Sequence, residues 1–176
     1  MERQINTQTI YDGKVVKLIK DEVELDDGTR SYREIVCHHG GACIALKKHD
    51  GKYFMVKQYR YSQSEDMLEF CAGKLNEGEN PLDAIIREAE EELGYTVKNL
   101  KSLGYIIPTC GYSSEKIYLY YGEADKYVGG HLDEDERLDV YAYTFEEIKQ
   151  MVMQGKIHDA KTICLMYRLE MEQING

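Results

Sequence analysis

Residues 73–95, GKLNEGENPLDAIIREAEEELGY, constrain the fold more than any other stretch of the chain. Asn80 suits the N-cap of a helix, Pro81 suits its first position, and Gly94 is the residue expected just past its end. At about 100° of turn per residue, the apolar side chains fall on one stripe, which comprises Leu82, Ile85, Ile86, Ala89 and Leu93. The pattern therefore predicts a short amphipathic helix that buries this stripe against another layer.

Segments with strand character lie on both sides of this helix. Before it we expect strands within 8–38, with turns at Asp12-Gly13 and at 26–28, then a hairpin with its turn at 49–51 and a short strand at 67–71. After it we expect strands at 95–107, 115–123 and 138–143, and helices at 144–154 and 160–172. Because helices and strands do not alternate regularly, the pattern favours an α+β sandwich with a mixed sheet over a doubly wound fold.

The composition argues against several classes of partner. The chain has 32 acidic and 22 basic residues, a net charge of -10, and no basic cluster that could bind a nucleic-acid backbone. No apolar run is long enough to span a membrane, and the N-terminus lacks the features of a secretory signal. We therefore expect a cytoplasmic protein that binds neither nucleic acid nor membrane. The five cysteines include no C-x-x-C pair, which argues against a disulfide framework or a structural zinc site.

Glutamates gather on one flank of the predicted helix. Glu88, Glu91 and Glu92 lie beside the apolar stripe, whereas Glu90 falls on another side. Converging carboxylates need a compensating cation, and a donor set made only of oxygen favours Mg²⁺ or Mn²⁺ over zinc. Such a site could hold a pyrophosphate for attack by water. The alternative is an ordinary charged helix face in contact with solvent.

The residues around the helix follow a longer pattern. Gly73, five residues, Glu79, seven residues and then REAEEELGY resemble the Nudix box, G-x5-E-x7-R-E-U-x-E-E-x-G-U, in which U is bulky or aliphatic. Ala89 and Tyr95 take the two U positions. The chance of seven accidental matches in one register is roughly 10⁻⁸. The seven fixed positions are Gly73, Glu79, Arg87, Glu88, Glu91, Glu92 and Gly94.

Segments outside the box resemble the ADP-ribose pyrophosphatase branch of the Nudix hydrolase superfamily. REIVCHHGGA at 33–42, PTCGYSSEKIYLYYGEA at 108–124 and DEDERLDVY at 133–141 are similar to segments typical of that branch. The resemblance covers roughly residues 8–145. It implies a Nudix-type α/β/α sandwich with a mixed β-sheet, preceded by an N-terminal β-strand region. We expect residues 1–40 to form that region and to mediate dimerisation, and 41–176 to form the hydrolase domain.

The resemblance also implies roles for single residues. The carbonyl of Ala72 with Glu88 and Glu92 resembles a set of metal ligands, supported by Glu91. Arg87 is expected to orient the box by pairing with an acid such as Glu79, which is then structural, as are Gly73 and Gly94. Arg60 and Glu115 resemble substrate-binding positions. Arg33 resembles an arginine that reaches the ligand from the partner subunit, because the branch forms homodimers that exchange N-terminal strands.

The resemblance also implies a general base in the late acidic loop, at Glu134 or Glu136. A carboxylate near bound Mg²⁺ could accept a proton from water. The alternative for this loop is a solvated tip with no role in catalysis. The chain departs from the branch where a usual proline is replaced by His39, Cys71 or Cys110.

Together these features predict a Mg²⁺-dependent hydrolase, with Mn²⁺ as a possible substitute, that splits the pyrophosphate of ADP-ribose into AMP and ribose 5-phosphate. One alternative is the same chemistry on another nucleotide sugar, such as GDP-mannose. A second is a sensor that binds ADP-ribose without cleaving it, although the chain has no spare length or basic charge for the DNA-binding module that such sensors carry.

Overall fold

The structure, a computed structural model, describes residues 1–132 and 137–174. Its strands are β1 (Arg3–Asp12), β2 (Lys17–Glu24), β3 (Arg30–Cys37), β4 (Gly41–Lys47), β5 (Tyr53–Arg60), β6 (Glu65–Glu69), β7 (Cys71–Lys74), β8 (Tyr95–Ile106), β9 (Ile117–Tyr127) and β10 (Leu138–Tyr143). Its helices are α1 (Pro81–Leu93), α2 (Phe145–Met153) and α3 (Ala160–Ile174). None of these helices is long and apolar enough to cross a membrane.

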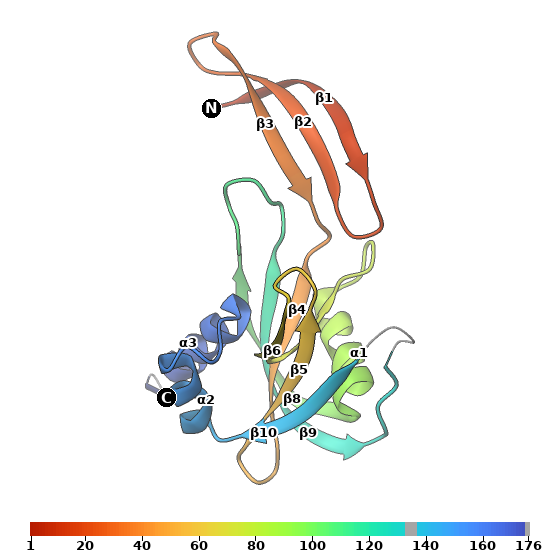
Figure 1. The fold of residues 1–176 in the computed structure, drawn as a ribbon, viewed down its shortest axis with the longest axis vertical. Coiled ribbons are helices and arrows are strands. Elements are labelled where there is room, and N and C mark those ends of the chain that lie inside the picture. The colour runs from red at the N-terminus through yellow and green to blue at the C-terminus, as the bar shows by residue number, and fades with distance from the viewer. Residues whose placement is uncertain (133–136, 175–176) are drawn as a thin grey trace. The chain divides into compact units, whose positions relative to one another are not determined.

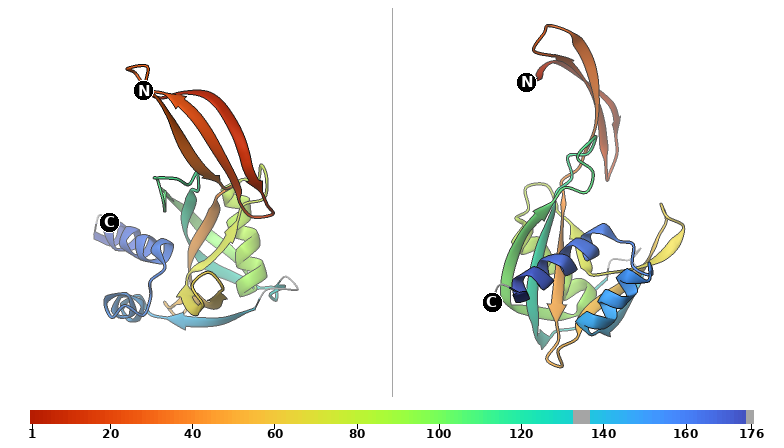
Figure 2. Two further views of the ribbon diagram at one scale, coloured as in Figure 1. Left: turned by 45° about the horizontal axis from the view of Figure 1, so that its top comes forward. Right: turned by 90° about the vertical axis from the view of Figure 1, so that its left-hand side faces the viewer.

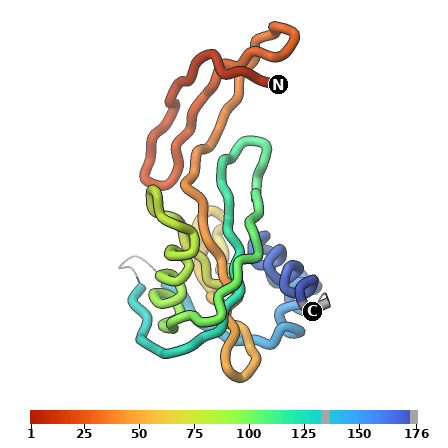
Figure 3. Tube along the Cα trace, turned by 180° about the vertical axis from the view of Figure 1, so that it is seen from behind, coloured from red at the N-terminus to blue at the C-terminus, as the bar shows by residue number. Residues whose placement is uncertain are grey.

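The described residues divide into two compact units. The first contains residues 1–40 and 107–116, and the second contains the described parts of 41–106 and 117–174. In the first unit, β1, β2 and β3 form an antiparallel sheet in chain order, seen in red and orange in Figure 3. Its turns fall at the two predicted places, after Asp12 and around Gly28. Residues 107–116 join this unit because Val36 exchanges backbone hydrogen bonds with Tyr112 and Ser114.

The second unit is a mixed sheet covered on both faces. Its strands lie in the order β10-β5-β4-β9-β8, with β6 paired to β5 and β7 paired to β4. The β4 and β9 strands run parallel, whereas the other pairs are antiparallel. Helix α1 covers one face, and α2 and α3 cover the other (Figures 1 and 2). The predicted α+β class and the α/β/α sandwich are therefore confirmed.

Strand β4 is the centre of this sheet, and residues 42–46 are completely buried. It pairs with β5 only next to the turn of their hairpin, at Lys47 and Tyr53. Beyond that point β7 takes the place beside β4, so that Ala72 lies opposite Cys43 and Gly73 opposite Ala42. The divergence of β4 and β5 thus brings the start of the predicted motif to the middle of the sheet.

Helix α1 begins and ends as the sequence predicts, but it buries a different face. The side chain of Asn80 accepts a hydrogen bond from the backbone N–H of Leu82, and Gly94 ends the helix with a left-handed φ of 75°. The predicted stripe is wrong at Leu82, which is 40% exposed, and at Ile86, which is only half-buried. The buried residues are Ala84, Ile85, Ala89, Glu92 and Leu93. Relative to the predicted stripe, the helix is rotated about its axis, so that the carboxylate of Glu92 faces the sheet together with the apolar side chains.

Gly94 provides a test of this packing. A Cβ at Gly94 would lie 2.8 Å from the backbone nitrogen of Gly130, whereas one at Gly78, with a similar φ of 74°, would meet nothing within 4 Å. We expect Gly78→Ala to lower the free energy of unfolding by about 1 kcal/mol through its positive φ alone, and Gly94→Ala to lower it by about 3 kcal/mol. Urea denaturation of both variants measures the difference. Equal losses would contradict the close packing at Gly94.

Candidate active site

The carboxylate of Glu88 lies against the backbone of β7. A Cβ built on Gly73 would be only 1.8 Å from Oε1 of Glu88, so no other residue could stand at this position without displacing that side chain. Gly73 directly follows Ala72, whose carbonyl is a predicted metal ligand. Strand β7 is fixed by its pairing with β4, so the Glu88 carboxylate lies beside a strand at the middle of the sheet. The glycine of the motif is therefore required by the close approach of a functional side chain.

Arg87 connects three of the glutamates. Its Nη1 donates to Oε1 of Glu88 and to Oε2 of Glu91, each at 2.8 Å, and its Nε donates to Oε1 of Glu79 at 3.1 Å. Oε2 of Glu79 also accepts the backbone N–H of Asn76 at 2.8 Å. The pairing of Arg87 with Glu79 is thus observed as predicted. The hydrogen bond from Arg87, followed by that from Asn76, lowers the pKa of Glu79, so its carboxylate is charged at neutral pH.

Glu92 has different surroundings from the other two carboxylates on its flank. Its exposed fraction is 7%, and it shares a hydrogen bond with the thiol of Cys71, the residue that stands where proline is usual. Burial, followed by the charge of Glu92, raises the pKa of Cys71, so the thiol keeps its proton and can donate it to the carboxylate. In contrast, the side chain of Glu91 is 39% exposed. The three acids share a flank of α1 but differ in depth.

The donor set fits a divalent cation, although the side chains are arranged around Arg87. Within residues 1–132 and 137–174, no three His, Cys, Asp or Glu side chains stand close enough together to hold a metal ion. The Arg87 guanidinium instead places a positive group between Glu88 and Glu91. All of the candidate ligands are oxygen atoms, as Mg²⁺ and Mn²⁺ prefer. The side-chain-free position at Gly73 leaves room for one of these carboxylates beside the Ala72 backbone.

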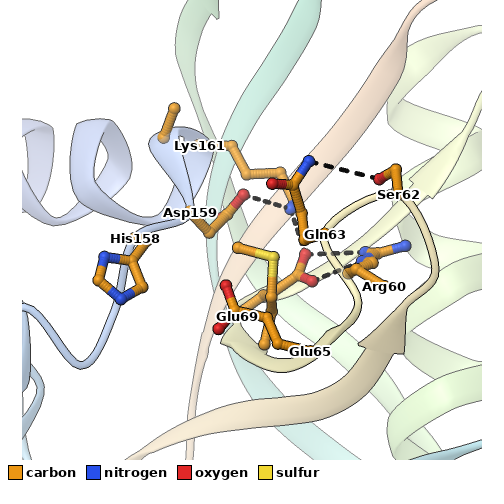
Figure 4. A pocket seen from close by; sticks show the side chains of 10 residues that line it. Arg60, Ser62, Gln63, Glu65, Glu69, His158, Asp159 and Lys161 are labelled. Atoms are coloured by element: carbon orange, nitrogen blue, oxygen red, sulfur yellow. Dashed lines mark hydrogen bonds and ion pairs between the residues drawn. The ribbon is translucent and has the colours of Figure 1, made fainter.

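A polar pocket of the second unit contains Arg60. This pocket of about 380 Å³ is lined by Arg60, Ser62, Gln63, Glu65, Met67, Glu69, His158, Asp159, Ala160 and Lys161 (Figure 4). Arg60 makes a two-pronged ion pair with Glu69, at 2.6 Å from Nε to Oε1 and 2.8 Å from Nη2 to Oε2. Lys161 contacts the same carboxylate. The sequence does not indicate Glu69 and Lys161, because nothing in the local pattern shows that β6 and the start of α3 meet.

Arg33 and Glu115 belong to the first unit. Arg33 donates from Nε to Glu2 at 2.9 Å, and it lines a pocket of about 590 Å³ formed by parts of 32–35 and 110–114. Nδ1 of His38 lies 3.6 Å from Glu115 and accepts the N–H of Gly40 at 3.0 Å. Of these two predicted substrate-binding residues, Arg33 is held by an ion pair within its own unit, and Glu115 lies beside His38.

The predicted site residues fall into groups. The structure joins Glu79, Arg87, Glu88 and Glu91 in one hydrogen-bonded cluster, and the backbone of Gly73 lies against Glu88. Glu134 and Glu136, the predicted general bases, lie outside the described residues.

The chain belongs to the NUDIX domain family. The model of that family matches residues 38–166 and so includes β4 to β9, α1 and the cluster described above. The match covers well over half of the chain, and it confirms the family that the spacing of the glutamates indicated.

Individual relatives extend over nearly the whole chain. The chain is 37% identical over 174 residues to a "methanol dehydrogenase activator" of Bacillus methanolicus, covering 98% of this chain and 94% of the relative. It is 34% identical to an "ADP-ribose pyrophosphatase" of Bacillus subtilis (strain 168), over 174 residues and with the same coverage. Among solved structures, that of an "ADP compounds hydrolase" has a TM-score of 0.85 and 16% identity, covering 99% of this chain and 95% of that chain. The last likeness confirms the fold.

Substitution of Gly73 tests whether the cluster binds metal. Because Gly73→Ala places a methyl group where the Glu88 carboxylate lies, we expect the affinity for Mn²⁺ to fall by about 10- to 100-fold. Titration calorimetry or the electron paramagnetic resonance signal of free Mn²⁺ measures this affinity without any substrate. Gly111→Ala is the matched control, since a Cβ there meets nothing within 4 Å and its φ is ordinary. Unchanged Mn²⁺ affinity in folded Gly73→Ala would place the metal elsewhere.

Proposed function

We propose that this chain is a metal-dependent hydrolase that splits the pyrophosphate of ADP-ribose into AMP and ribose 5-phosphate. The observation that carries the proposal is the contact between Glu88 and Gly73, in a chain of the NUDIX domain family. The contact holds an anionic helix flank against the strand with no side chain between them. The choice of ADP-ribose is supported by the relative named ADP-ribose pyrophosphatase, which aligns over 98% of this chain.

We propose that the Ala72 carbonyl, Glu88 and Glu92 are the ligands of Mg²⁺ or Mn²⁺, with Glu91 beside them. When bound, the ion would supply the positive charge that a pyrophosphate needs next to an acidic helix and would make a bound water more acidic. Glu88 and Glu91 would then exchange part of their bonding to Arg87 for the ion. Arg87 keeps its bonds to Glu79 in this proposal, and so it holds the start of the motif in place.

The chain's other residues would bind and orient the substrate. Arg60 supplies a guanidinium held by Glu69, which suits the charge and shape of a phosphate group. Arg33 and Glu115 are proposed as further substrate contacts, and Glu134 or Glu136 as the base that accepts the proton of the attacking water. A cytoplasmic location stays a prediction from the sequence.

We propose that the first unit mediates a homodimer with exchanged N-terminal strands. Strand β1 is exposed at nine of its ten positions, Ile10 and Tyr11 among them, and the unit also exposes Tyr32 and Tyr112. A three-stranded sheet with so little covered apolar surface gains stability from a further layer. In such a dimer Arg33 of one subunit would reach the substrate of the other.

Substitution on β1 tests the dimer. We expect Ile10→Glu, at a side chain that is 50% exposed, to shift the protein toward monomer because it places a charge in the proposed interface. Light scattering after size-exclusion chromatography measures the mass. Met153→Glu, on α2 in the second unit and 77% exposed, is the control that should leave the mass unchanged. A monomeric wild-type protein would rule out the dimer.

Substrate choice and metal ligation are tested together. With millimolar Mg²⁺ and a panel of nucleoside diphosphate derivatives that includes GDP-mannose, we expect ADP-ribose to give the fastest release of nucleoside monophosphate. Glu92→Gln should lower kcat by about 100-fold, because an anionic ligand becomes neutral while the fold is kept. Glu90→Gln, on the same helix but outside the cluster, should keep full turnover.

The alternatives give different results in this experiment. An ADP-ribose rate about tenfold below that of another substrate would overturn the choice of substrate and favour that nucleotide sugar. Binding of ADP-ribose without hydrolysis of any compound would favour a sensor.

A second candidate function is the activation of an alcohol dehydrogenase. It is favoured by the relative named methanol dehydrogenase activator, which is 37% identical over 98% of this chain. Adding the purified chain to a methanol dehydrogenase and following its rate, with Glu92→Gln as the comparison, would show whether such activation occurs and whether it needs the hydrolase site.

A further inference from the structure

A buried network of charges connects α3 to Arg60. Glu69, at the end of β6, is 1% exposed and pairs with both Arg60 and Lys161. Lys161 also donates to Oδ1 of Asp159 at 2.8 Å. The network therefore contains two cations and two anions that alternate along a chain, Arg60–Glu69–Lys161–Asp159, as Figure 4 shows.

Arg60, Glu69 and Lys161 are charged at neutral pH. Burial alone would raise the pKa of Glu69, but the hydrogen bonds and charges of Arg60 and Lys161 outweigh it and hold that pKa below its usual range. Burial would likewise lower the pKa of Lys161, but the charges of Asp159 and Glu69 outweigh it and raise that pKa. A buried charge without a partner is costly, so each member of the network fixes the position of the next.

The far end of the network is anchored in the backbone. Asp159 accepts the N–H of Thr162 at 2.9 Å and its hydroxyl at 2.6 Å, which caps the first turn of α3. The hydroxyl oxygen of Thr162 accepts the N–H of Phe70 at 2.9 Å, at the junction of β6 and β7. Lys161 is thus held between a capped helix end and a strand that leads directly to Ala72 and Gly73.

The near end of the network presents a guanidinium with one free edge. Nε and Nη2 of Arg60 are both bonded to Glu69. Within the part of the chain that the structure describes, Nη1 donates no hydrogen bond, and the Arg60 side chain is 38% exposed at the pocket. The hydrogen bonds that Arg60 donates to Glu69 raise the pKa of Arg60, so this edge is positively charged at neutral pH.

We propose that Lys161 is a positioning residue that acts through Glu69 to hold the Arg60 guanidinium in one orientation, with its free edge available to the phosphate groups of a nucleoside diphosphate substrate. This inference rests on the proposed function. Lys161 is 12% exposed and already bonded to two carboxylates, so it is placed to restrain Glu69 and not to bind substrate itself. Without Lys161, Glu69 keeps one cationic partner, and Asp159 repels it.

Nuclear magnetic resonance tests the orientation without any substrate. The Nε–H signal of Arg60, assigned by its disappearance in Arg60→Lys, should exchange slowly with water in the wild type because it is bonded to Glu69. In Lys161→Met we expect this exchange to be at least about tenfold faster, and in Lys161→Arg to stay near the wild-type value. Unchanged exchange in Lys161→Met would overturn the proposal.

Kinetics test whether the orientation matters for the reaction. On the best substrate of the panel, Lys161→Met should lower kcat/KM by about tenfold, and Arg60→Met by more. The double variant should lose no more than Arg60→Met alone, because Lys161 acts through Arg60. Multiplied losses in the double variant would show that Lys161 acts independently, and an unchanged kcat/KM in the single variant would show a purely structural ion pair. Either result overturns the proposal.

Controls separate this inference from folding defects and from the proposed function. Lys149→Met removes a solvent-exposed ion pair with Glu170 away from the pocket, and it should leave both measurements unchanged. If Lys161→Met does not fold, Glu69→Gln replaces it, with the same faster exchange expected for Arg60. If the wild type hydrolyses no compound, the proposed function fails. The affinity for inorganic pyrophosphate with Mg²⁺ is then measured for Lys161→Met, Arg60→Met and the double variant. If the losses of affinity in the two single variants multiply in the double variant, the inference is overturned.

Discussion

The guanidinium of Arg87 is the interaction on which the geometry of α1 depends. Carboxylates at positions 88, 91 and 92 of one helix repel each other, and such pairs destabilise a helix by a few tenths of a kcal/mol each. Arg87 lies on the same helix and bonds to Glu88 and Glu91 while it also holds Glu79 from the preceding loop. A single cation thus fixes the loop, the helix and two of the acids relative to each other. Glu92 is buried separately beside the thiol of Cys71, whose hydrogen bond to the carboxylate offsets part of the cost of that burial.

The ends of the elements were predictable from sequence because they depend on local chemistry. Asn80, Pro81 and Gly94 define α1 as expected, and the capping box of Thr144 and Glu147 begins α2. The buried face of α1 was predicted less well. Leu82 belongs to the apolar stripe by periodicity, yet it is exposed because the helix turns Glu92 toward the sheet. Periodicity counts apolar residues, and it cannot anticipate that a carboxylate is buried.

The residues of the candidate site also divide into those that the local sequence indicates and those that only the tertiary fold brings together. The spacing of the glutamates and of Gly73 indicated the cluster because its members lie within 22 residues of each other. Glu69 and Lys161 are 92 residues apart, and their contact requires the tertiary fold. In the sequence, Cys71 stands out only as a replacement for a usual proline. Its bond to Glu92 gives that replacement a chemical meaning, since proline could not donate a hydrogen bond from its side chain.

The parallel pairing of β4 with β9 has a consequence for how the second unit folds. Gly41 lies opposite Ile117, so this pairing closes a loop of 76 residues before the centre of the sheet exists. Parallel pairs between distant segments form slowly, because the entropy of closing the loop is lost before contacts compensate for it. Strand β7 and helix α1 lie inside that loop, and β7 pairs with β4. The order of assembly therefore separates two events: α1 can form early from local signals, whereas its acidic flank meets a completed sheet only after the two ends of the loop have joined.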